Sequence, residues 1–315
     1  VVVDVLASAF DSAGQRCSAL RVLCLQDDVA DHTLKMLRGA MAECRMGNPG
    51  RLTTDIGPVI DAEAKANIEN HIQAMRAKGR PVFQAVRENS EDAREWQTGT
   101  FVPPTLIELA SFDELKKEVF GPVLHVVRYN RNNLNALIDQ INASGYGLTL
   151  GVHTRIDETI AQVTGTAKVG NLYVNRNMVG AVVGVQPFGG EGLSGTGPKA
   201  GGPLYLYRLL ANRPENALGV TLARQDAEYP VDAQVKAVLT QPLEALIAWA
   251  EKRPELRAVA QQYGELAQAG TQRLLPGPTG ERNTWTLMPR EHVLCVADNE
   301  QDALVQLAAA MATGC

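Results

Sequence analysis

The pattern of apolar and polar positions predicts that helices and strands alternate over residues 1–175. Apolar residues recur at helical spacing or gather in short runs, and glycine, proline and polar turns separate these segments. Strands that alternate with helices of this length are typical of an α/β domain with a largely parallel sheet. Helices are predicted at 2–10, 27–44, 61–78, 134–143 and 157–168, and strands at 19–25, 81–86, 101–107, 123–129, 148–154 and 171–175.

The rest of the sequence is less regular. Residues 178–203 are rich in glycine and are predicted to form a long loop, with Val182, Val183 and Val185 as its apolar anchors. A long loop inside a compact domain is usually functional or disordered. Beyond it the pattern predicts a strand at 206–210, two or three helices within 232–269 broken at Pro242 and Pro254, a linker at 275–285, a strand at 293–296 and a helix at 300–312.

The composition is that of a globular protein and argues against several functional classes. The 315 residues provide one large domain or two ordinary ones, with 45% hydrophobic and 21% charged residues. A net charge of −5 without a dense Lys/Arg block does not indicate a nucleic-acid or anionic-membrane surface. The five cysteines form no CxxC pair, which favours a reducing cytoplasm over a disulfide framework, and no metal site is predicted.

Neither end of the sequence looks like a targeting segment. The opening VVVDVLASAF has no basic leader and no cleavage site, and no apolar run approaches the ~20 residues that span a bilayer. The sequence begins inside a predicted helix without an initiator methionine, and it ends on MATGC without a helix cap. We therefore expect it to be a piece of a longer polypeptide.

One cysteine lies in a polar turn rather than in an apolar run. Cys17 ends the Gly-Gln-Arg-Cys turn at 14–17, between a predicted helix and a predicted strand. A thiolate is a strong nucleophile, and the N–H groups of such a turn are available to hold an oxyanion. Most cysteines are only small buried residues. That is what we expect of the other four, whereas Cys17 is the candidate nucleophile.

Two further segments carry candidate binding groups. Glu118 and Phe120 precede a Gly-Pro turn, where a carboxylate is suited to both hydroxyls of a ribose and an aromatic ring to a planar group. A surface glutamate and a core phenylalanine are the alternative. Residues 175–197 contain repeated glycines, which let backbone approach a ligand, and Phe188 in a rigid turn after Pro187. The GxGxxG fingerprint of dinucleotide-binding folds is absent.

Together these segments resemble the aldehyde dehydrogenase superfamily. The family's Gly-Gln-x-Cys turn is matched at 14–17, its Glu-x-Phe-Gly-Pro segment at 118–122 and its Pro-Phe-Gly-Gly-x-x-x-Ser-Gly segment at 187–195, in the family's order. The resemblance covers residues 1–210. It implies the family's α/β fold, Cys17 as the catalytic nucleophile, and NAD as the cofactor, with Glu118 on the nicotinamide ribose and Phe120 beside the ring.

Within the superfamily, the loop sequences resemble the L-glutamate γ-semialdehyde (pyrroline-5-carboxylate) dehydrogenase branch. This implies that Ser18 and the backbone amides of Gly180 and Ala181 hold the α-carboxylate of glutamate semialdehyde, while Phe188 packs on its carbon chain. Such a set of N–H and hydroxyl donors is able to bind an anion without an arginine. Taken alone, Ser18 is equally an ordinary small residue at the start of a strand.

Residues 211–315 resemble the bacterial bifunctional proline-utilization family, in which proline dehydrogenase and the semialdehyde dehydrogenase share one chain. The resemblance implies a catalytic domain at 1–210 without its upstream NAD-binding part, a mostly helical extension at 211–272, and the start of a noncatalytic α/β domain at 273–315. FAD belongs only to the proline dehydrogenase part, which is absent here. The family forms homo-oligomers through a flap at the position of 206–210. DNA or membrane binding by the full-length protein is left open, since it needs other segments.

The implied reaction oxidises the aldehyde to L-glutamate through a thiohemiacetal and a thioester on Cys17. In family order, the amide that completes the oxyanion hole and the glutamate that activates water precede Val1. We therefore expect this sequence alone to be inactive, since losing one oxyanion donor commonly costs ~10²–10³ in rate.

Three other functions compete with this interpretation. A noncatalytic aldehyde dehydrogenase-like assembly domain is expected to lack Cys17 or Glu118, and both are present. A relative that reduces γ-glutamyl phosphate with NADPH is disfavoured by the Glu-Val-Phe-Gly-Pro segment at 118–122. A cysteine hydrolase requires a partner histidine, and none of the five histidines lies in a supporting motif.

Overall fold

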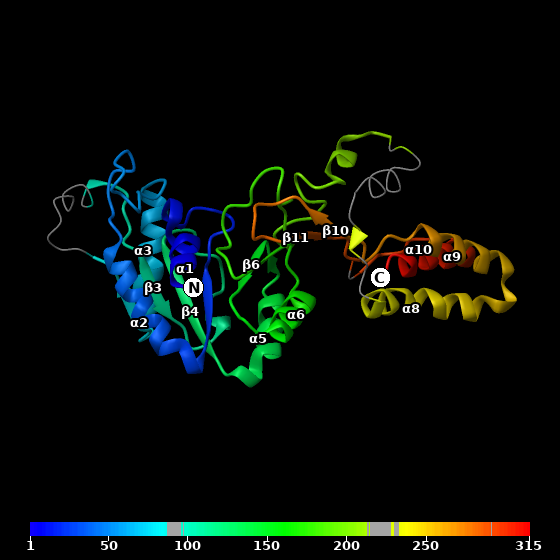
Figure 1. Cartoon of the computed structure of the whole chain (residues 1–315), viewed down its shortest axis with the longest axis horizontal. Helices are drawn as coiled ribbons and strands as arrows, with labels where there is room; N and C mark the ends of the chain where they lie inside the picture. The colour runs from blue at the N-terminus through cyan, green and yellow to red at the C-terminus, as the bar shows by residue number, and fades with distance from the viewer. Residues whose placement is uncertain (87–95, 97, 213, 215–227, 230–232, 291) are drawn as a thin grey trace. The chain divides into compact units, whose positions relative to one another are not determined.

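A four-stranded sheet is the centre of the first of the two units into which the chain divides (Figure 1). The first unit comprises Val1–Val182 and Phe188–Tyr205, and the second comprises Val183–Pro187 and Leu206–Cys315. The computed structural model describes all residues except 87–95, 97, 213, 215–227, 230–232 and 291. Part of the predicted helical extension at 211–272 therefore lies outside the described residues.

The strand order in this sheet is β1-β4-β3-β2. β1 (Val22–Gln26) is parallel to β4 (Val123–Tyr129), and β4 is parallel to β3 (Thr105–Glu108). β2 (Val82–Gln84) is antiparallel to β3 at the sheet's edge. Residues 123–127 of β4 are all buried, as expected for a parallel strand covered on both faces. The prediction of an α/β fold with a largely parallel sheet is confirmed.

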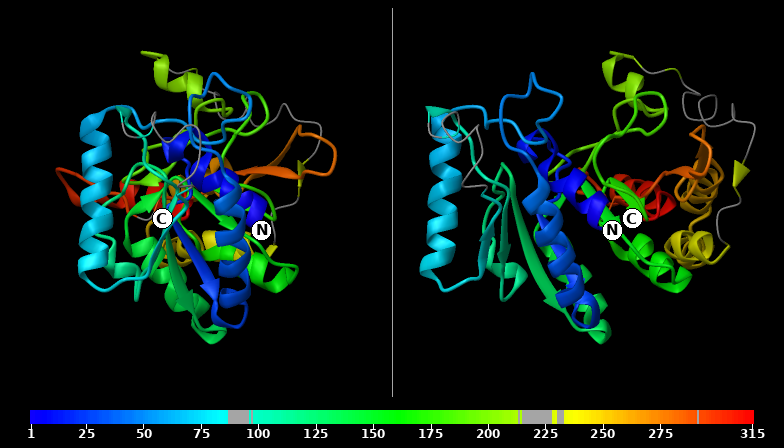
Figure 2. Two further views of the ribbon diagram at one scale, coloured as in Figure 1. Left: turned by 90° about the vertical axis from the view of Figure 1, so that its left-hand side faces the viewer. Right: turned by 60° about the vertical axis from the view of Figure 1, so that its left-hand side comes forward.

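Helices cover both faces of the sheet. Figure 2 shows α3 (Ala62–Ala77) on one face and α1 (Val2–Phe10) and α2 (Asp27–Glu43) on the other. The apolar positions of α2 and α3 recur at three- and four-residue spacing, so one stripe of each helix faces the sheet. The buried residues of these stripes are Ala30, Leu34, Leu37 and Met41 in α2 and Ile68, Ile72 and Met75 in α3.

A smaller set of elements completes the first unit. α5 (Leu134–Ala143), β6 (Thr149–Val152), α6 (Asp157–Thr166) and β7 (Asn171–Val174) follow the predicted order, and β6 and β7 pair in parallel. The connections contain further short elements, of which β5 and β8 pair antiparallel. These elements are the 3-10 helices η1 (Asp11–Gly14), η2 (Phe112–Glu114) and η3 (Arg131–Asn133), and the strands β5 (Tyr146–Gly147) and β8 (Glu191–Gly192).

The second unit contains helices that pack on one another and a small antiparallel sheet. α8 (Ala233–Trp249), α9 (Pro254–Leu266) and α10 (Glu300–Ala312) share an apolar core, and η5 (Ala250–Lys252) joins the first two. The sheet has the order β11-β10-β9, formed by Asn283–Thr286, Gln272–Leu275 and Glu228–Tyr229. Among the described residues, no helix is long and apolar enough to cross a membrane.

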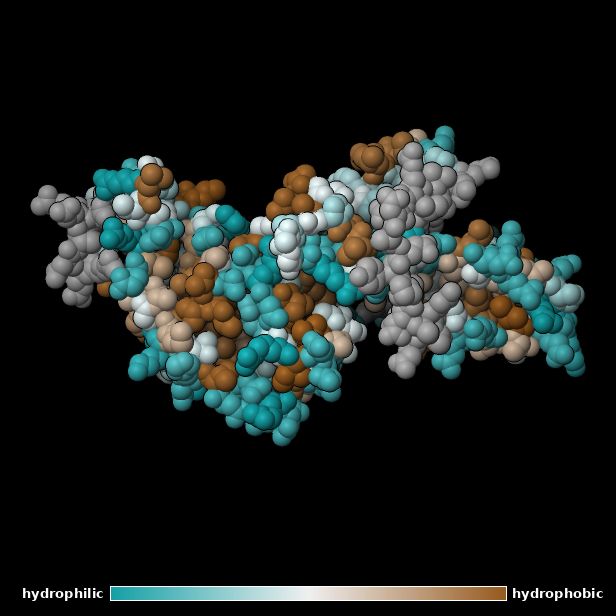
Figure 3. Space-filling model, viewed as in Figure 1, coloured by the Kyte–Doolittle hydropathy of each residue, from teal (hydrophilic) through white to brown (hydrophobic). Residues whose placement is uncertain are grey.

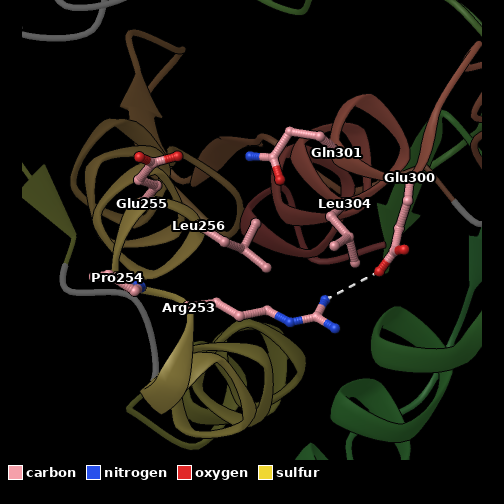
Figure 4. A pocket seen from close by; sticks show the side chains of 7 residues that line it. All are labelled: Arg253, Pro254, Glu255, Leu256, Glu300, Gln301 and Leu304. Carbon is pink, nitrogen blue, oxygen red and sulfur yellow. Dashed lines mark hydrogen bonds and ion pairs between the residues drawn. The ribbon is translucent and has the colours of Figure 1, made fainter.

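A pocket of about 460 Å³ opens between α9 and α10. Arg253, at the start of α9, reaches across it and donates a hydrogen bond to Glu300 of α10 at 3.4 Å (Figure 4). None of the candidate site residues lines this pocket. We therefore assign the pocket no part in the predicted chemistry.

Two strand predictions are wrong. Residues 206–210 do not form a strand, since η4 (Tyr205–Leu209) is a 3-10 helix. Leu206 and Leu209 are each 71% exposed, and Figure 3 shows hydrophobic side chains at the surface in the region of η4. Residues 293–296 form no strand either, and their Leu294 is 88% exposed. Both segments are apolar runs, and an apolar run becomes a strand only where another strand offers hydrogen bonds.

Two further local predictions fail in the second unit. Pro242 lies inside α8 instead of ending it, although a helix does break before Pro254, the first residue of α9. The predicted linker at 275–285 contains the turn and most of the second strand of the hairpin β10–β11. These strands read QRLL and NTWT, which lack the apolar alternation on which the strand prediction depends.

A buried histidine of the sheet contacts a half-buried histidine of α3. His125, on β4, is 0% exposed, and its Nε2 lies 2.8 Å from Nε2 of His71 on α3. Its Nδ1 lies 3.1 Å from the Arg21 carbonyl oxygen. A neutral His125 satisfies both contacts: its Nδ1–H donates to the Arg21 carbonyl oxygen, and its Nε2 accepts a hydrogen bond from the Nε2–H of His71. Burial lowers the pKa of His125 from 6.5 to about 4, so the folded protein keeps this ring neutral.

We predict that this pair makes the first unit sensitive to acid. As the pH falls from about 6.5 to about 4, His125 takes up a proton in the unfolded chain but not in the folded one, so the free energy of unfolding decreases by a few kcal/mol. Replacing His125→Gln should remove that part of the decrease. The measurement is urea unfolding near neutral pH and near pH 5. The exposed His32→Gln is the control, and an equal effect of both substitutions contradicts the prediction.

Candidate active site

The segment before Cys17 is a turn with left-handed backbone. Ser12, Ala13 and Gly14 have φ angles of 57°, 53° and 65°, so η1 differs from an ordinary 3-10 helix. Non-glycine residues adopt this conformation at a cost of roughly 1 kcal/mol each. The turn reverses the chain at the end of α1 and presents Cys17 at the surface. No hydrogen bond to the thiol or the amide of Cys17 is found within the described part of the chain.

Gln15 fixes this turn to the loop at 58–60. Its side-chain Nε2 donates to the carbonyl oxygens of Ser12 at 3.2 Å and Pro58 at 3.3 Å, and its Oε1 accepts from the Ile60 amide at 2.8 Å. A side-chain amide both donates and accepts, so it is able to make all three bonds. The glutamine of the Gly-Gln-x-Cys pattern thus holds the shape of the turn.

Arg21 joins the turn to the segment that contains Glu118. Its Nη1 donates to the Gly14 carbonyl oxygen at 2.6 Å and its Nη2 to the Arg16 carbonyl oxygen at 3.1 Å. Its Nε donates to Glu118 Oε1 at 2.9 Å, and its guanidinium lies 4.7 Å from the centroid of the Phe120 ring. The Arg21 side chain is 13% exposed. Burial lowers its pKa, and the hydrogen bond to Glu118 opposes that effect.

The two segments also touch through glycines. A Cβ atom on Gly14 would lie 2.1 Å from the Gly121 carbonyl oxygen, closer than any real Cβ contact. Gly121 is itself confined, since a Cβ there would lie 2.3 Å from Cδ1 of Ile68 on α3. Glycine is therefore required at position 14 for the Cys17 turn to lie against the Glu118 segment, whereas a side chain at position 121 would have to displace the end of the Ile68 side chain.

Glu118 and Phe120 remain accessible within this contact. The Glu118 side chain is 39% exposed and has one carboxylate oxygen on Arg21, and Phe120 is 47% exposed. A large apolar ring is normally buried. An accessible carboxylate beside an accessible ring fits a ligand that combines a diol with a planar ring.

Ser8 connects the Cys17 segment with the glycine-rich segment. Its carbonyl oxygen accepts from the Leu20 amide at 2.8 Å, and its Oγ accepts from the Met178 amide at 3.1 Å. Gly180 follows two residues later with a φ of 84°, and Ala181 is half-buried. Ser18 is buried, and its carbonyl oxygen accepts from Oγ1 of Thr149 on β6 at 3.4 Å.

The anchors of the glycine-rich segment differ from those predicted. Val182 and Val183 are 54% and 97% exposed, so they do not anchor the loop. Met178 and Val179, which precede the first glycine of this loop, are buried in their place. The Ser8–Met178 hydrogen bond pairs a buried hydroxyl with a buried amide, and a hydrophobic pattern gives no signal for it.

Phe188 has a separate support near the start of β7. It exchanges both backbone hydrogen bonds with Ala200 at 3.0 Å, and the next amide, of Gly189, donates to Asn171 Oδ1 at 3.1 Å. Lys199 Nζ donates to the Gly170 carbonyl oxygen, and burial lowers the pKa of Lys199. The structure thus brings Cys17, Glu118 and Phe120 together through Arg21, whereas Phe188 is held by other residues.

Cys24 illustrates why the remaining cysteines are poor nucleophiles. Its thiol on β1 is buried, and this raises its pKa to about 12, so it stays protonated. None of the five cysteines forms a disulfide, and of the four others only Cys295 is exposed.

Comparison with known proteins agrees with the motifs. Residues 1–211 match the model of the aldehyde dehydrogenase family. Over all of its length the chain is 87% identical to the bifunctional protein PutA of Escherichia coli (strain K12), of which it spans 24%. In a crystal structure of Bradyrhizobium japonicum proline utilization A, 66% of the chain aligns with 20% of that protein at 51% identity and a TM-score of 0.61.

A second solved structure contains a bound cofactor. It is the 1-pyrroline-5-carboxylate dehydrogenase from Thermus with bound NAD, 33% identical over 65% of this chain and 38% of that protein, with a TM-score of 0.57. The resemblance stated from the three motifs is therefore confirmed at the level of the family.

The Gly14–Gly121 contact gives a testable prediction. Gly14→Ala places a side chain on left-handed backbone and against the Gly121 carbonyl, so the free energy of unfolding should decrease by more than about 1 kcal/mol. Gly39→Ala is the matched control, because Gly39 lies exposed in α2 with no atom within 4 Å of the added Cβ. That variant should be neutral or more stable by up to ~1 kcal/mol. Urea unfolding measures both, and similar values for both variants contradict the prediction.

Proposed function

This chain belongs to the aldehyde dehydrogenase family, and on that premise we propose that it is part of an NAD-dependent L-glutamate γ-semialdehyde dehydrogenase. The reaction yields L-glutamate and is the second step of proline catabolism. The chain spans 24% of the length of the E. coli relative. The proposal therefore concerns the full-length protein, in which a proline dehydrogenase with FAD precedes this part.

One observation carries the proposal. The exposed Cys17, with an amide free to hold an oxyanion, lies in a turn that Arg21 ties to the accessible Glu118 and Phe120. A nucleophile and a site for a ribose and a planar ring are the two parts that this oxidation requires. The Thermus structure with bound NAD, 33% identical to this chain, supports NAD as the cofactor.

The chemistry begins with the Cys17 thiolate. It attacks the aldehyde carbon and forms a thiohemiacetal, whose oxyanion accepts a hydrogen bond from the Cys17 amide. NAD, when bound with its ribose on Glu118 and its ring near Phe120, supplies the acceptor for the hydride. The thioester left on Cys17 is then hydrolysed by water, which releases glutamate and the thiol. The groups that activate this water and complete the oxyanion hole precede Val1 in family order, so we propose that this sequence alone is inactive.

The substrate's α-carboxylate is assigned to the glycine-rich segment. We propose that the Ser18 hydroxyl and the amides of Gly180 and Ala181 bind it, while Phe188 packs on the carbon chain. The φ of 84° at Gly180 and the burial of Met178 and Val179 support this assignment, because they turn the backbone at a fixed position.

The domain boundaries are also a proposal. The family match at 1–211 supports a catalytic part at 1–210. In the second unit α10 packs on α8 and α9, which supports a separate part after residue 210. We propose to divide that part into the extension at 211–272 and the start of a noncatalytic domain at 273–315. The exposed leucines of η4 support a homo-oligomer contact, and the unpaired cysteines support a cytoplasmic location.

Replacing the nucleophile tests the reaction. In the full-length protein, Cys17→Ser should reduce the rate of NADH formation from glutamate semialdehyde by roughly 10³-fold or more. The control is Cys295→Ser, which changes the other exposed cysteine that lies outside the site. Turnover by Cys17→Ser equal to that of the control would falsify the proposed mechanism.

A comparison of substrates tests the carboxylate site. The full-length protein should oxidise glutamate semialdehyde with a lower KM than an aldehyde of equal length without the carboxylate, and it should not reduce γ-glutamyl phosphate with NADPH. Ser18→Ala should raise the KM for the semialdehyde about 10-fold, because a hydrogen bond to a charged group is lost. The KM for the uncharged aldehyde is the internal control. An equal rise for both aldehydes contradicts the role of Ser18.

A further inference from the structure

The guanidinium of Arg21 is shared between the two segments that carry the proposed chemistry. It donates four hydrogen bonds, three to main-chain carbonyl oxygens and one to a carboxylate. Two of them, to the carbonyl oxygens of Gly14 and Arg16, fix the turn that contains Cys17. The other two, to Glu118 Oε1 at 2.9 Å and the Gly121 carbonyl oxygen at 3.4 Å, fix the segment with Glu118.

We propose that Arg21 is a positioning residue of the dehydrogenase site, which sets Cys17 and the carboxylate of Glu118 relative to each other. This inference rests on the proposed function, because the roles of Cys17 and Glu118 belong to it. Among the described residues Arg21 makes no hydrogen bond to the Cys17 thiol, although the two groups interact electrostatically. It acts through the residues that it holds.

The geometry of the contacts requires an arginine. Nε, Nη1 and Nη2 all donate, and they lie in one plane with fixed directions. A lysine presents one flexible ammonium group, which cannot reach the carboxylate of Glu118 and the carbonyls of Gly14 and Arg16 in the same way. The guanidinium also lies over the Phe120 ring at 4.7 Å, so it supports both cofactor-binding candidates from one side.

The contact leaves Glu118 available for a ligand. Arg21 occupies Oε1 only, and the Glu118 side chain is still 39% exposed. A carboxylate has two oxygens and about four acceptor positions. Arg21 therefore restricts the rotation of this carboxylate without occupying the atoms that a ribose diol requires.

Arg128 provides a matched control. It lies on β4 and pairs with Asp31 at 2.7 Å and with Glu108 at 3.1 Å. Like Arg21, which immediately precedes β1, it is a partly buried arginine with a carboxylate partner, although its side chain is more exposed, at 38% against 13%. None of those partners belongs to the candidate site. Loss of Arg128 thus measures what the loss of a comparable arginine does to stability alone.

The first experiment compares Arg21→Met, Arg21→Lys and Arg128→Met in the full-length protein. Urea unfolding measures stability, calorimetry measures NAD⁺ binding, and mass-mapped iodoacetamide labelling measures the reactivity of Cys17. We expect both Arg21 variants to weaken NAD⁺ binding, Arg21→Met by about 10-fold or more, and to slow labelling of Cys17, since each loses charged hydrogen bonds in the site. Arg128→Met should leave both properties unchanged. Equal changes for Arg128→Met and the Arg21 variants overturn the proposal, and Arg21→Lys keeps the test valid if Arg21→Met does not fold.

The second experiment asks whether Arg21 acts through Glu118. Glu118→Gln and the double variant with Arg21→Lys are added, and NAD⁺ binding is measured for all four forms. If Arg21 positions the carboxylate, the substitution of Arg21 should weaken binding strongly in the native background and by less than 2-fold in the Glu118→Gln background. If the loss of NAD⁺ affinity in the double variant equals the product of the losses in the two single variants, the proposal is overturned.

These readouts remain informative if the proposed function fails. Absence of NADH formation from glutamate semialdehyde by the native protein overturns the proposed function alone. If the native protein also fails to bind NAD⁺, the labelling of Cys17 decides the role of Arg21. Slower labelling in the Arg21 variants but not in Arg128→Met then supports a positioning role for Arg21, and equal labelling in all variants overturns it.

Discussion

The parallel pairing of β1 with β4 is the constraint on which the site depends. Two parallel neighbours run in the same direction, so the segments that precede them reach the sheet at the same edge. The turn with Cys17 precedes β1, and the segment with Glu118 and Phe120 precedes β4. About 100 residues separate the two segments along the chain, yet the register that pairs Val22 with His125 leaves them side by side. Hydrogen bonds between the main chains of β1 and β4 thus bring the two segments with candidate site residues to the same edge of the sheet.

This constraint explains which features were predictable from the sequence. The elements of the first unit follow clear apolar patterns, and β4 and α5 have the predicted bounds, because buried strands and amphipathic helices both leave a periodic signal. The first two motifs indicated Cys17, Glu118 and Phe120 as candidates, because their residue types are chemically distinctive. The family itself was predictable because the motifs occur in order.

The supporting residues were not predictable in the same way. Arg21, Gln15 and Ser8 make bonds whose partners lie 3 to 170 residues away and include many backbone atoms. A pattern of hydrophobicity contains no information about such partners. The failures in the second unit have the same origin. The strands QRLL and NTWT form by pairing with each other, whereas the apolar residues at 293–296 pair with no strand in the part of the chain that the structure describes.

The left-handed turn shows why these supporting residues matter. Ser12 and Ala13 both adopt a backbone conformation that disfavours L-residues, so the turn is not the conformation that its own sequence prefers. Strained backbone persists only where the surroundings determine it. Here those surroundings are Gln15, which fixes the turn to the loop at 58–60, and Arg21, which fixes it to the Glu118 segment. The position of Cys17 is therefore set by the contacts of the turn with the loop at 58–60 and with the Glu118 segment, so Gln15 and Arg21 matter to the candidate site as well as the cysteine.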